Sequence, residues 1–259
     1  DDAVVSQTWT SIDSGRTNAG KFSFKRYNFA GTSKLIFVDG VNRASFYNGS
    51  SVTDITHSDA PSAPSIVEIF KNHVFLSGHS ASPNQVFFSA PFSENDFSSG
   101  NGGGSISVDD TVVALKTFRD QLYVFGREKI FKITGNTLSD FVLQPVTRDL
   151  GCSAKHSVQE LGGDIIFLAP DGLRTIAGTD KIGDVELGTI SKPVQVKFDG
   201  LTSFDQIESV VVPTKTQYRI FFVNETDSVA NTLGIIASLT QQGFVFSELK
   251  GIKPACTDY

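Results

Sequence analysis

One stretch of this chain occurs twice almost in register, and this repetition constrains the fold more than any other feature. The segment Leu-Lys-Thr-Phe-Arg-Asp-Gln-Leu-Tyr-Val-Phe-Gly at residues 115–126 matches residues 67–78, forty-eight positions earlier. In both copies an apolar run meets a two-residue polar turn, continues into a second β-prone run and ends at Gly, which is the pattern of a tight β-hairpin. Residues 158–168 form a weaker third copy. The sequence therefore predicts a fold assembled from a recurring hairpin unit.

The spacing of the hairpins predicts the architecture. The second strand of each expected hairpin supplies a marker, and the markers are Leu35, Val74, Leu122, Ile165 and Tyr218. Intervals of about 40 to 50 residues are those of a four-stranded propeller blade. We therefore expect an all-β fold, a β-propeller with five blades of about four antiparallel strands. The expected blades cover residues 21–60, 61–108, 109–150, 151–200 and 201–259.

Composition and strand character agree with this expectation. The 259 residues include 22 Phe and 23 Gly but no Met, which suits aromatic strands joined by Gly turns. No window holds apolar residues at helical spacing without interruption. The runs 122–125 and 218–223 are apolar at nearly every position, as in sheets covered on both faces. A single β-sandwich is the structural alternative, and it favours cleaner alternation.

Residues 1–20 are expected to lie outside the regular strands of the blades. The segment is polar, and its bulky apolar residues are Val4, Val5, Trp9 and Ile12. It is interpreted either as an extended arm or as a strand that closes the propeller, with Trp9 as a packing anchor. The propeller domain itself is expected over residues 21–259. The lack of Met predicts that residue 1 is not the translational start.

The charge balance disfavours a protein that binds nucleic acid tightly. The chain carries 22 Lys and Arg against 28 Asp and Glu, which gives a net charge of −6, and it has no long block of like charges. No run of about 18 apolar residues occurs, so no membrane contact is expected. Two cysteines, Cys152 and Cys256, are too few for a disulfide framework and are interpreted as reduced, partly buried thiols.

Candidate catalytic residues do not combine into a recognisable site. Asp171-Gly172 resembles a fragment of the Asp-box turn of sialidase-like propellers, but it lacks the flanking residues, so an ordinary hairpin turn is favoured. Cys152 lies four residues before His156, and no third partner for nucleophilic catalysis is evident. We therefore expect no enzymatic activity and no catalytic residues.

Candidate ligand-binding segments are equally incomplete. Residues 100–104 are rich in Gly but lack the Gly-Lys-Ser/Thr ending of a phosphate loop, and they are interpreted as flexible. The acidic pairs Asp109 with Asp110 and Glu94 with Asp96 are interpreted as solvated loop charges, because neither belongs to the alternating series of a Ca²⁺ loop. The sequence predicts no cofactor-binding residues, no metal-binding residues and no cofactor.

Between residues 65 and 180 a series of short strings follows a fixed order. The first strings lie at residues 72–78, 83–91 and 94–97. Their order is a small turn, a β-run, Gly, Pro-Asn, a second β-run, Ser, Pro and Asp-Phe. The series continues through residues 106–108, 115–125, 130–135, 150–153, 157–158 and 166–172. Taken in this order, the strings resemble the propeller region of the tail hub, nozzle or tail stabilisation proteins of short-tailed bacteriophages.

The resemblance implies a structural virion protein that resides in the tail and is assembled in the host cytoplasm. Such a subunit forms a homo-oligomeric ring, expected as a hexamer, below the portal and adaptor, and it contacts these and other tail proteins. Genomic DNA passes through the ring without sequence-specific binding, and an acidic or neutral lumen lets it slide. Residues 92–105 and the N-terminal arm become candidates for contacts with neighbours. Complete members of the family are longer and carry a second domain that forms the tube.

Two other functions remain as alternatives. A secreted carbohydrate-binding or glycosidase propeller is suggested by Asp171-Gly172, although glycosidases need two carboxylates about 5 to 10 Å apart and sugar sites favour exposed aromatic residues. A cellular scaffold that docks peptides on one face is the third hypothesis, but the repeat lacks the Gly-His and Trp-Asp signatures of the WD class.

Overall fold

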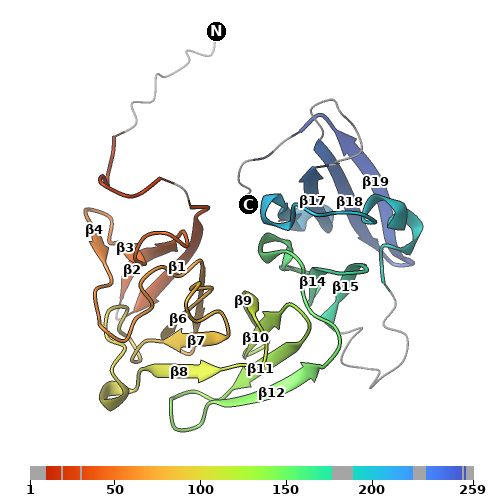
Figure 1. The fold of residues 1–259 in the computed structure, drawn as a ribbon. Coiled ribbons are helices and arrows are strands. Elements are labelled where there is room, and N and C mark those ends of the chain that lie inside the picture. Colours follow the sequence, from red (N-terminus) through yellow and green to blue (C-terminus); the bar gives the residue numbers. More distant parts are fainter. Residues whose placement is uncertain are drawn as a thin grey trace. The chain divides into compact units, whose positions relative to one another are not determined.

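The computed structural model describes residues 10–18, 20–29, 31–176, 189–223, 232–252 and 254. The described strands form five antiparallel sheets, and strands that follow one another in the chain are neighbours in the sheet (Figure 1). The chain divides into two compact units, Asp1–Ser105 and Ile106–Tyr259. None of the helices in the described residues is long and apolar enough to cross a membrane.

The first unit contains two four-stranded sheets. The first sheet comprises β1 (Ser23–Phe29), β2 (Thr32–Val38), β3 (Ser45–Tyr47) and β4 (Val52–Asp54). The second sheet comprises β5 (Ile66–Phe70), β6 (His73–Ser77), β7 (Gln85–Phe88) and β8 (Gly104–Ser107), with the 3-10 helix η1 (Ser99–Asn101) before β8. Side chains of both sheets share one core, which includes Tyr27, Phe29, Ile36, Val38, Val67, Val74, Leu76 and Phe97. The two sheets therefore stack face to face.

The second unit contains three sheets. The third sheet comprises β9 (Val112–Phe118), β10 (Gln121–Gly126), β11 (Ile130–Thr134) and β12 (Val142–Thr147). The fourth comprises β13 (Gln159–Leu161), β14 (Asp164–Ala169) and β15 (Gly172–Thr175). The fifth comprises β16 (Glu208–Val212), β17 (Gln217–Val223), β18 (Thr232–Thr240) and β19 (Gly243–Lys250). The 3-10 helices of this unit are η2 (Lys155–Ser157), η3 (Lys192–Lys197), η4 (Phe204–Gln206) and η5 (Pro213–Lys215).

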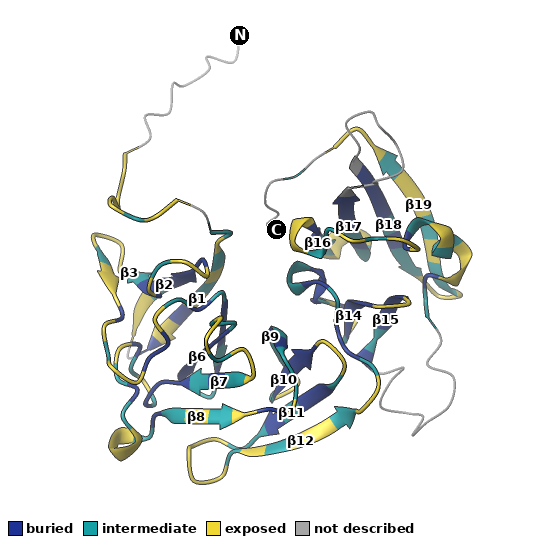
Figure 2. Cartoon of the chain, in the orientation of Figure 1, coloured by how far each residue is buried: buried dark blue, intermediate teal, exposed yellow. Residues whose placement is uncertain are grey.

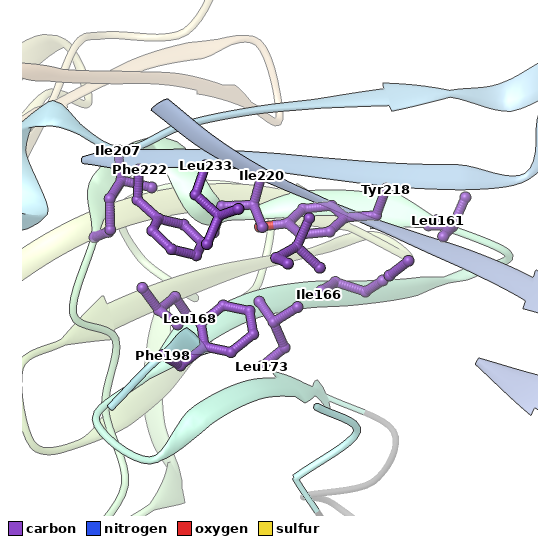
Figure 3. Packing of buried hydrophobic residues seen from close by; sticks show 13 residues of the cluster. Leu161, Ile166, Leu168, Leu173, Phe198, Ile207, Tyr218, Ile220, Phe222 and Leu233 are labelled. Carbon is purple, nitrogen blue, oxygen red and sulfur yellow. The ribbon is translucent and has the colours of Figure 1, made fainter. Parts of the chain in front are cut away.

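The fourth sheet lies between two hydrophobic cores. On one side, Phe167 of β14 packs against Phe125 of β10, with ring centroids 5.3 Å apart, in the core shared with the third sheet. On the other side, Ile166 and Leu168 meet side chains of the fifth sheet such as Tyr218 (Figure 3). Neighbouring positions of β14 thus point to opposite cores, because successive side chains of a strand alternate between the faces. This explains why the strand is apolar at every position from 165 to 169.

In the third and fifth sheets, burial falls from the middle strands to the last strand. In β10 the residues from Leu122 to Gly126 are all buried, whereas β12 and β19 contain only intermediate and exposed positions (Figure 2). The edge strand β12 contains Pro145, which lacks a backbone N–H and is tolerated at a sheet edge. The apolar runs predicted for the middle strands are therefore confirmed, and the third and fifth sheets each end in a partly exposed strand.

The repeated hairpins have the same turn geometry in all three copies. Both central residues have positive φ, which is typical of the type I′ turn that matches the twist of paired strands. The angles are 49° and 63° at Lys71 and Asn72, 46° and 64° at Arg119 and Asp120, and 63° and 77° at Gly162 and Gly163. The hairpins predicted at these three places are confirmed by the pairing of β5 with β6, β9 with β10 and β13 with β14. All five markers lie in the second strand of a sheet. Five separate sheets also exclude the single sandwich.

The structure refines one expectation. Residues 93–105 form a connection between β7 and β8, as the sequence indicated, but residues 100–104, interpreted as flexible, include the end of η1 and the start of β8 at Gly104. In the fourth sheet, three of the four expected strands lie in the described residues. Most of the fourth strand expected there, at residues 185–190, lies outside the described residues.

Candidate assembly surface

In the described part of the N-terminal arm, residues 10–18, Arg16 contacts the first sheet. The guanidinium of Arg16 lies 4.8 Å from the centroid of the Phe37 ring and 3.2 Å from Oδ1 of Asp54 on β4. It also pairs with Asp13 within the arm. A planar guanidinium can stack on an aromatic ring and donate hydrogen bonds in its own plane at the same time. Residues 10–18 include no strand, so whether the arm closes the propeller depends on residues 1–9, which lie outside the described residues.

A buried carboxylate fixes the turn on which the arm rests. Asp39 accepts hydrogen bonds from the backbone N–H groups of Val41 and Asn42, at 2.9 and 2.7 Å. Burial alone would raise the pKa of Asp39, but these hydrogen bonds, one from the Asn42 side chain and the nearby Arg16 lower it below its usual range. Asn42 in turn accepts the N–H of Thr17 at 3.0 Å and donates to its carbonyl at 2.9 Å.

The loop at residues 92–103 is ordered by one aspartate. Asp96 accepts hydrogen bonds from the hydroxyl and backbone N–H of Ser98, at 2.6 and 2.9 Å, and from the side chain of Asn101 at 2.6 Å. These bonds, first of all those from Ser98, lower the pKa of Asp96 to about 2. A Cβ on Gly103 would lie 2.6 Å from the carbonyl carbon of Phe97, so this close turn needs glycine. The loop is therefore a folded element.

The loop exposes an aromatic side chain in an unfavourable backbone conformation. Phe92 has a φ of 60° and is 60% exposed. Its N–H donates to the carbonyl of Asn72 at 2.8 Å, and its ring approaches that of Phe29 edge-on at 6.4 Å. A bulky residue at positive φ costs free energy, and such strain is often found at functional positions. An exposed aromatic side chain on an ordered loop is the kind of group that anchors protein interfaces.

The arm and the loop are connected through the segment that follows β4. Asp54 holds Arg16 of the arm, and two residues later the N–H of Thr56 donates to Oδ1 of Asn95 at 3.3 Å. Nε2 of His57 lies 3.7 Å from Oδ1 of Asp96. Residues 10–18, 54–57 and 92–103 are thus linked, and we call them the arm-and-loop surface.

Acidic residues considered above as Ca²⁺ ligands form ion pairs and hydrogen bonds within the fold. Glu94 pairs with Lys34 of β2, and burial together with Glu94 raises the pKa of Tyr27 nearby. Asp109 pairs with Lys129 at 2.6 Å, while Asp110 accepts two backbone N–H groups of the β10–β11 turn, at 2.7 and 2.8 Å. No group of three or more metal-ligating side chains occurs in the described part of the chain.

Asp171 lies in a hairpin turn, as the sequence indicated. Its carboxylate forms an ion pair with Arg174 across the β14–β15 turn, and Gly172 has a φ of 122°. A pocket of about 190 Å³ lies beside this turn, and its walls include Leu168, Pro170, Phe198 and Leu201. Ligand pockets usually measure about 300–1,000 Å³, so the pocket suits a few water molecules better than a sugar.

Cys152 is a buried structural thiol. Its Sγ donates to the carbonyl of Ala154 at 3.3 Å and lies 3.7 Å from the hydroxyl of Ser157. Burial raises the pKa of the Cys152 thiol to about 11, so the nucleophilic thiolate is scarce at neutral pH. Nδ1 of His156 lies 4.0 Å from Glu208 instead. Cys256 falls outside the described residues.

Solved structures that are similar to this chain are β-propellers. Sqt1 of Saccharomyces cerevisiae is 12% identical, with a TM-score of 0.50 over 85% of this chain and 60% of its own. Hsv2 of Kluyveromyces lactis is 11% identical, with a TM-score of 0.41 over 89% and 72%. BamB of Moraxella catarrhalis is 12% identical, with a TM-score of 0.37 over 90% and 71%. No protein-family profile and no curated protein matches the sequence.

At such low identity the similarity concerns the fold alone. Of these three structures, we base the fold assignment on Sqt1, which has the TM-score of 0.50. This chain is an all-β protein of the β-propeller type, built from repeated antiparallel sheets.

The sequence analysis named both segments of the arm-and-loop surface, residues 92–105 and the N-terminal arm, but it missed the roles of the side chains that hold them. The signal for Asp96 was present, because Asp followed two residues later by Ser is typical of an Asx-turn. Arg16 had no such signal, since its partners are brought to it from β2 and β4 by tertiary folding.

Proposed function

We propose that this chain is a structural subunit of a bacteriophage tail, a hub or nozzle protein that forms an oligomeric ring below the portal and adaptor. The observation that carries the proposal is the order of the short strings between residues 65 and 180, which resembles the propeller region of these proteins. In this role the chain is a component of the virion, and genomic DNA passes through the ring without sequence-specific binding. The net charge of −6 suits such a passage, because a strongly basic wall would hold phosphate.

Many residues of these strings have structural roles here, which supports a structural function. Asn72 supplies a turn residue with positive φ, and Cys152 is buried beneath the fourth sheet. Asp96 orders its loop, and Asp171 pairs across its turn. A subunit whose task is assembly needs a rigid scaffold and exposed loops rather than a catalytic site.

We further propose that the five sheets are the five blades of one propeller domain. Each consists of three or four consecutive antiparallel strands, and within each compact unit successive sheets stack face to face. This is the blade arrangement of propellers, in which radial repetition leaves only short outer edges.

The arm-and-loop surface is the proposed contact with neighbouring subunits. Its loop offers Phe92, 60% exposed, on an ordered backbone, and an aromatic anchor of this kind commonly dominates an interface. Little conformational entropy is lost on binding, because the Asp96 hydrogen bonds already hold the loop.

Native mass measurement and electron microscopy of the purified chain, alone and mixed with tail-less phage capsids, test the proposal. We expect rings that dock at the portal vertex. The variant Phe92→Ser should weaken ring formation at least tenfold, whereas Val196→Ser, which alters a side chain 75% exposed on η3, should not. Monomers that ignore the capsids at every concentration would contradict the tail function.

A further inference from the structure

The sequence contains two Asn-Gly dipeptides, Asn48-Gly49 and Asn101-Gly102, and both lie in the first unit. Deamidation of asparagine is fastest where glycine follows, because glycine has no side chain that hinders its backbone nitrogen from attacking the asparagine amide. Both asparagines are exposed. The sequence therefore does not distinguish the two sites, and the structure around each of them decides which one can react.

Asn48 begins the turn between β3 and β4, and its amide is arranged for attack. Its Oδ1 accepts the backbone N–H groups of Ser50 and Ser51, each at 2.9 Å. Two N–H donors at a carbonyl oxygen stabilise the negative charge that develops there when a nucleophile attacks the carbon. Within the described residues, neither the N–H of Gly49 nor Nδ2 of Asn48 donates a hydrogen bond. A Cβ at Gly49 would meet nothing within 4 Å, so the turn is open to water.

Asn101 has the same neighbour in the sequence but the opposite arrangement. Its Nδ2, the leaving group in a deamidation, donates a hydrogen bond to Oδ2 of Asp96 at 2.6 Å. The N–H of Gly102, which would be the nucleophile, donates to the carbonyl of Ser99 at 3.2 Å at the end of η1. Both hydrogen bonds must be broken before this site reacts, and this requirement slows the reaction.

We propose that Asn48 is a deamidation site of the folded chain and that Asn101 is protected. The backbone nitrogen of Gly49 loses its proton and bonds to Cγ of Asn48, the bond from Cγ to Nδ2 breaks, and ammonia leaves. Water then opens the succinimide at either carbonyl, which gives aspartate or isoaspartate without an oxidant or reductant. The product adds one negative charge to a chain whose net charge is −6, and isoaspartate lengthens the backbone of the turn. The inference does not depend on the proposed tail function.

Peptide mapping of the full chain, incubated in mildly alkaline heavy-oxygen water, tests the proposal. In the folded chain the peptide with Asn48 should gain the mass of an amide-to-acid change, with one heavy oxygen, about tenfold faster than the peptide with Asn101. In guanidinium chloride the two rates should become similar, because both sites are then unfolded Asn-Gly. Equal rates in the folded chain would overturn the proposal, as would a rate at Asn48 well below that in the unfolded chain.

A matched pair of variants tests the reaction route. Gly49→Ala places a methyl group beside the attacking nitrogen and should slow the reaction at Asn48 severalfold. The control is Gly31→Ala, because Gly31 also lies in the first unit, has a φ of 86° against 97° at Gly49 and has open space at its Cβ position. It should leave the rate at Asn48 unchanged. Both positions are exposed, so both variants should fold, and circular dichroism verifies this. Aspartate formed without isoaspartate, at a rate that Gly49→Ala does not change, would indicate direct hydrolysis by water and contradict the proposed route.

Discussion

Two strands of the third sheet, β10 and β12, differ in almost every respect although each belongs to the same four-stranded unit. Every residue of β10 from Leu122 to Gly126 is buried, while β12 contains only exposed and intermediate positions and includes Pro145. The first is covered on both faces, and the second forms the edge of its sheet. The difference teaches that stability resides in the middle strands, whereas the turns, loops and outer strands are available for other tasks.

The largest expected effect contrasts these two strands directly. Phe125→Ala should lower the free energy of unfolding by about 3–5 kcal/mol, because it leaves a cavity beside Phe167 in a fully buried position. Val142→Ala, on β12 at 50% exposure, should cost less than about 0.5 kcal/mol. Urea denaturation of the two variants gives both values. Equal losses would show that the middle and the edge of the sheet contribute alike.

A smaller effect concerns the hairpin turns. Gly163→Ala should lower the free energy of unfolding by about 1 kcal/mol, because Gly163 has a φ of 77° and an alanine there is strained even though space is available. The equivalent position of the second sheet is Asn72. Asn72→Gly should raise the free energy of unfolding only slightly, by about 0.3 kcal/mol, since Asn already tolerates positive φ. Melting curves of this matched pair should shift in opposite directions. A shift of the same sign in both would contradict a shared turn type.

The smallest effect is a dependence on pH at the arm-and-loop surface. The pKa of Asp96 is about 2 in the folded chain, below the ordinary value of about 3.9. A lowered pKa means that its stabilising effect is complete above about pH 4 and is lost as pH falls toward 2. The difference in melting temperature between the native chain and Asp96→Asn should therefore be largest above about pH 4 and vanish near about pH 2. A difference that does not change with pH would show that the charge of Asp96 is not what orders the loop.

The middle strands and their turns were accessible from the sequence, whereas for the arm-and-loop surface only the two segments were indicated and not the contacts that order them. The hairpins at 67–78 and 115–126 were predicted at the correct residues, because strand pairing across a two-residue turn depends on neighbours in the chain. The sequence indicated a loop at residues 93–105, but polar Gly-rich composition does not reveal that Asp96 accepts three hydrogen bonds there. The exposure of Phe92 was equally hidden, because nothing in the sequence distinguishes it from a core phenylalanine.

The sequence by itself determined that this protein is built from repeated antiparallel hairpins, where their turns fall and which strands are apolar on both faces. Those properties follow from alternation and turn chemistry, which act over a few residues. Only the tertiary structure decided that Arg16 is held between Phe37 and Asp54, and that Phe22 and Phe24 face outward while Tyr27 and Phe29 face the core. These arrangements depend on which sheet stacks on which face, and that is set by packing between segments distant in the chain.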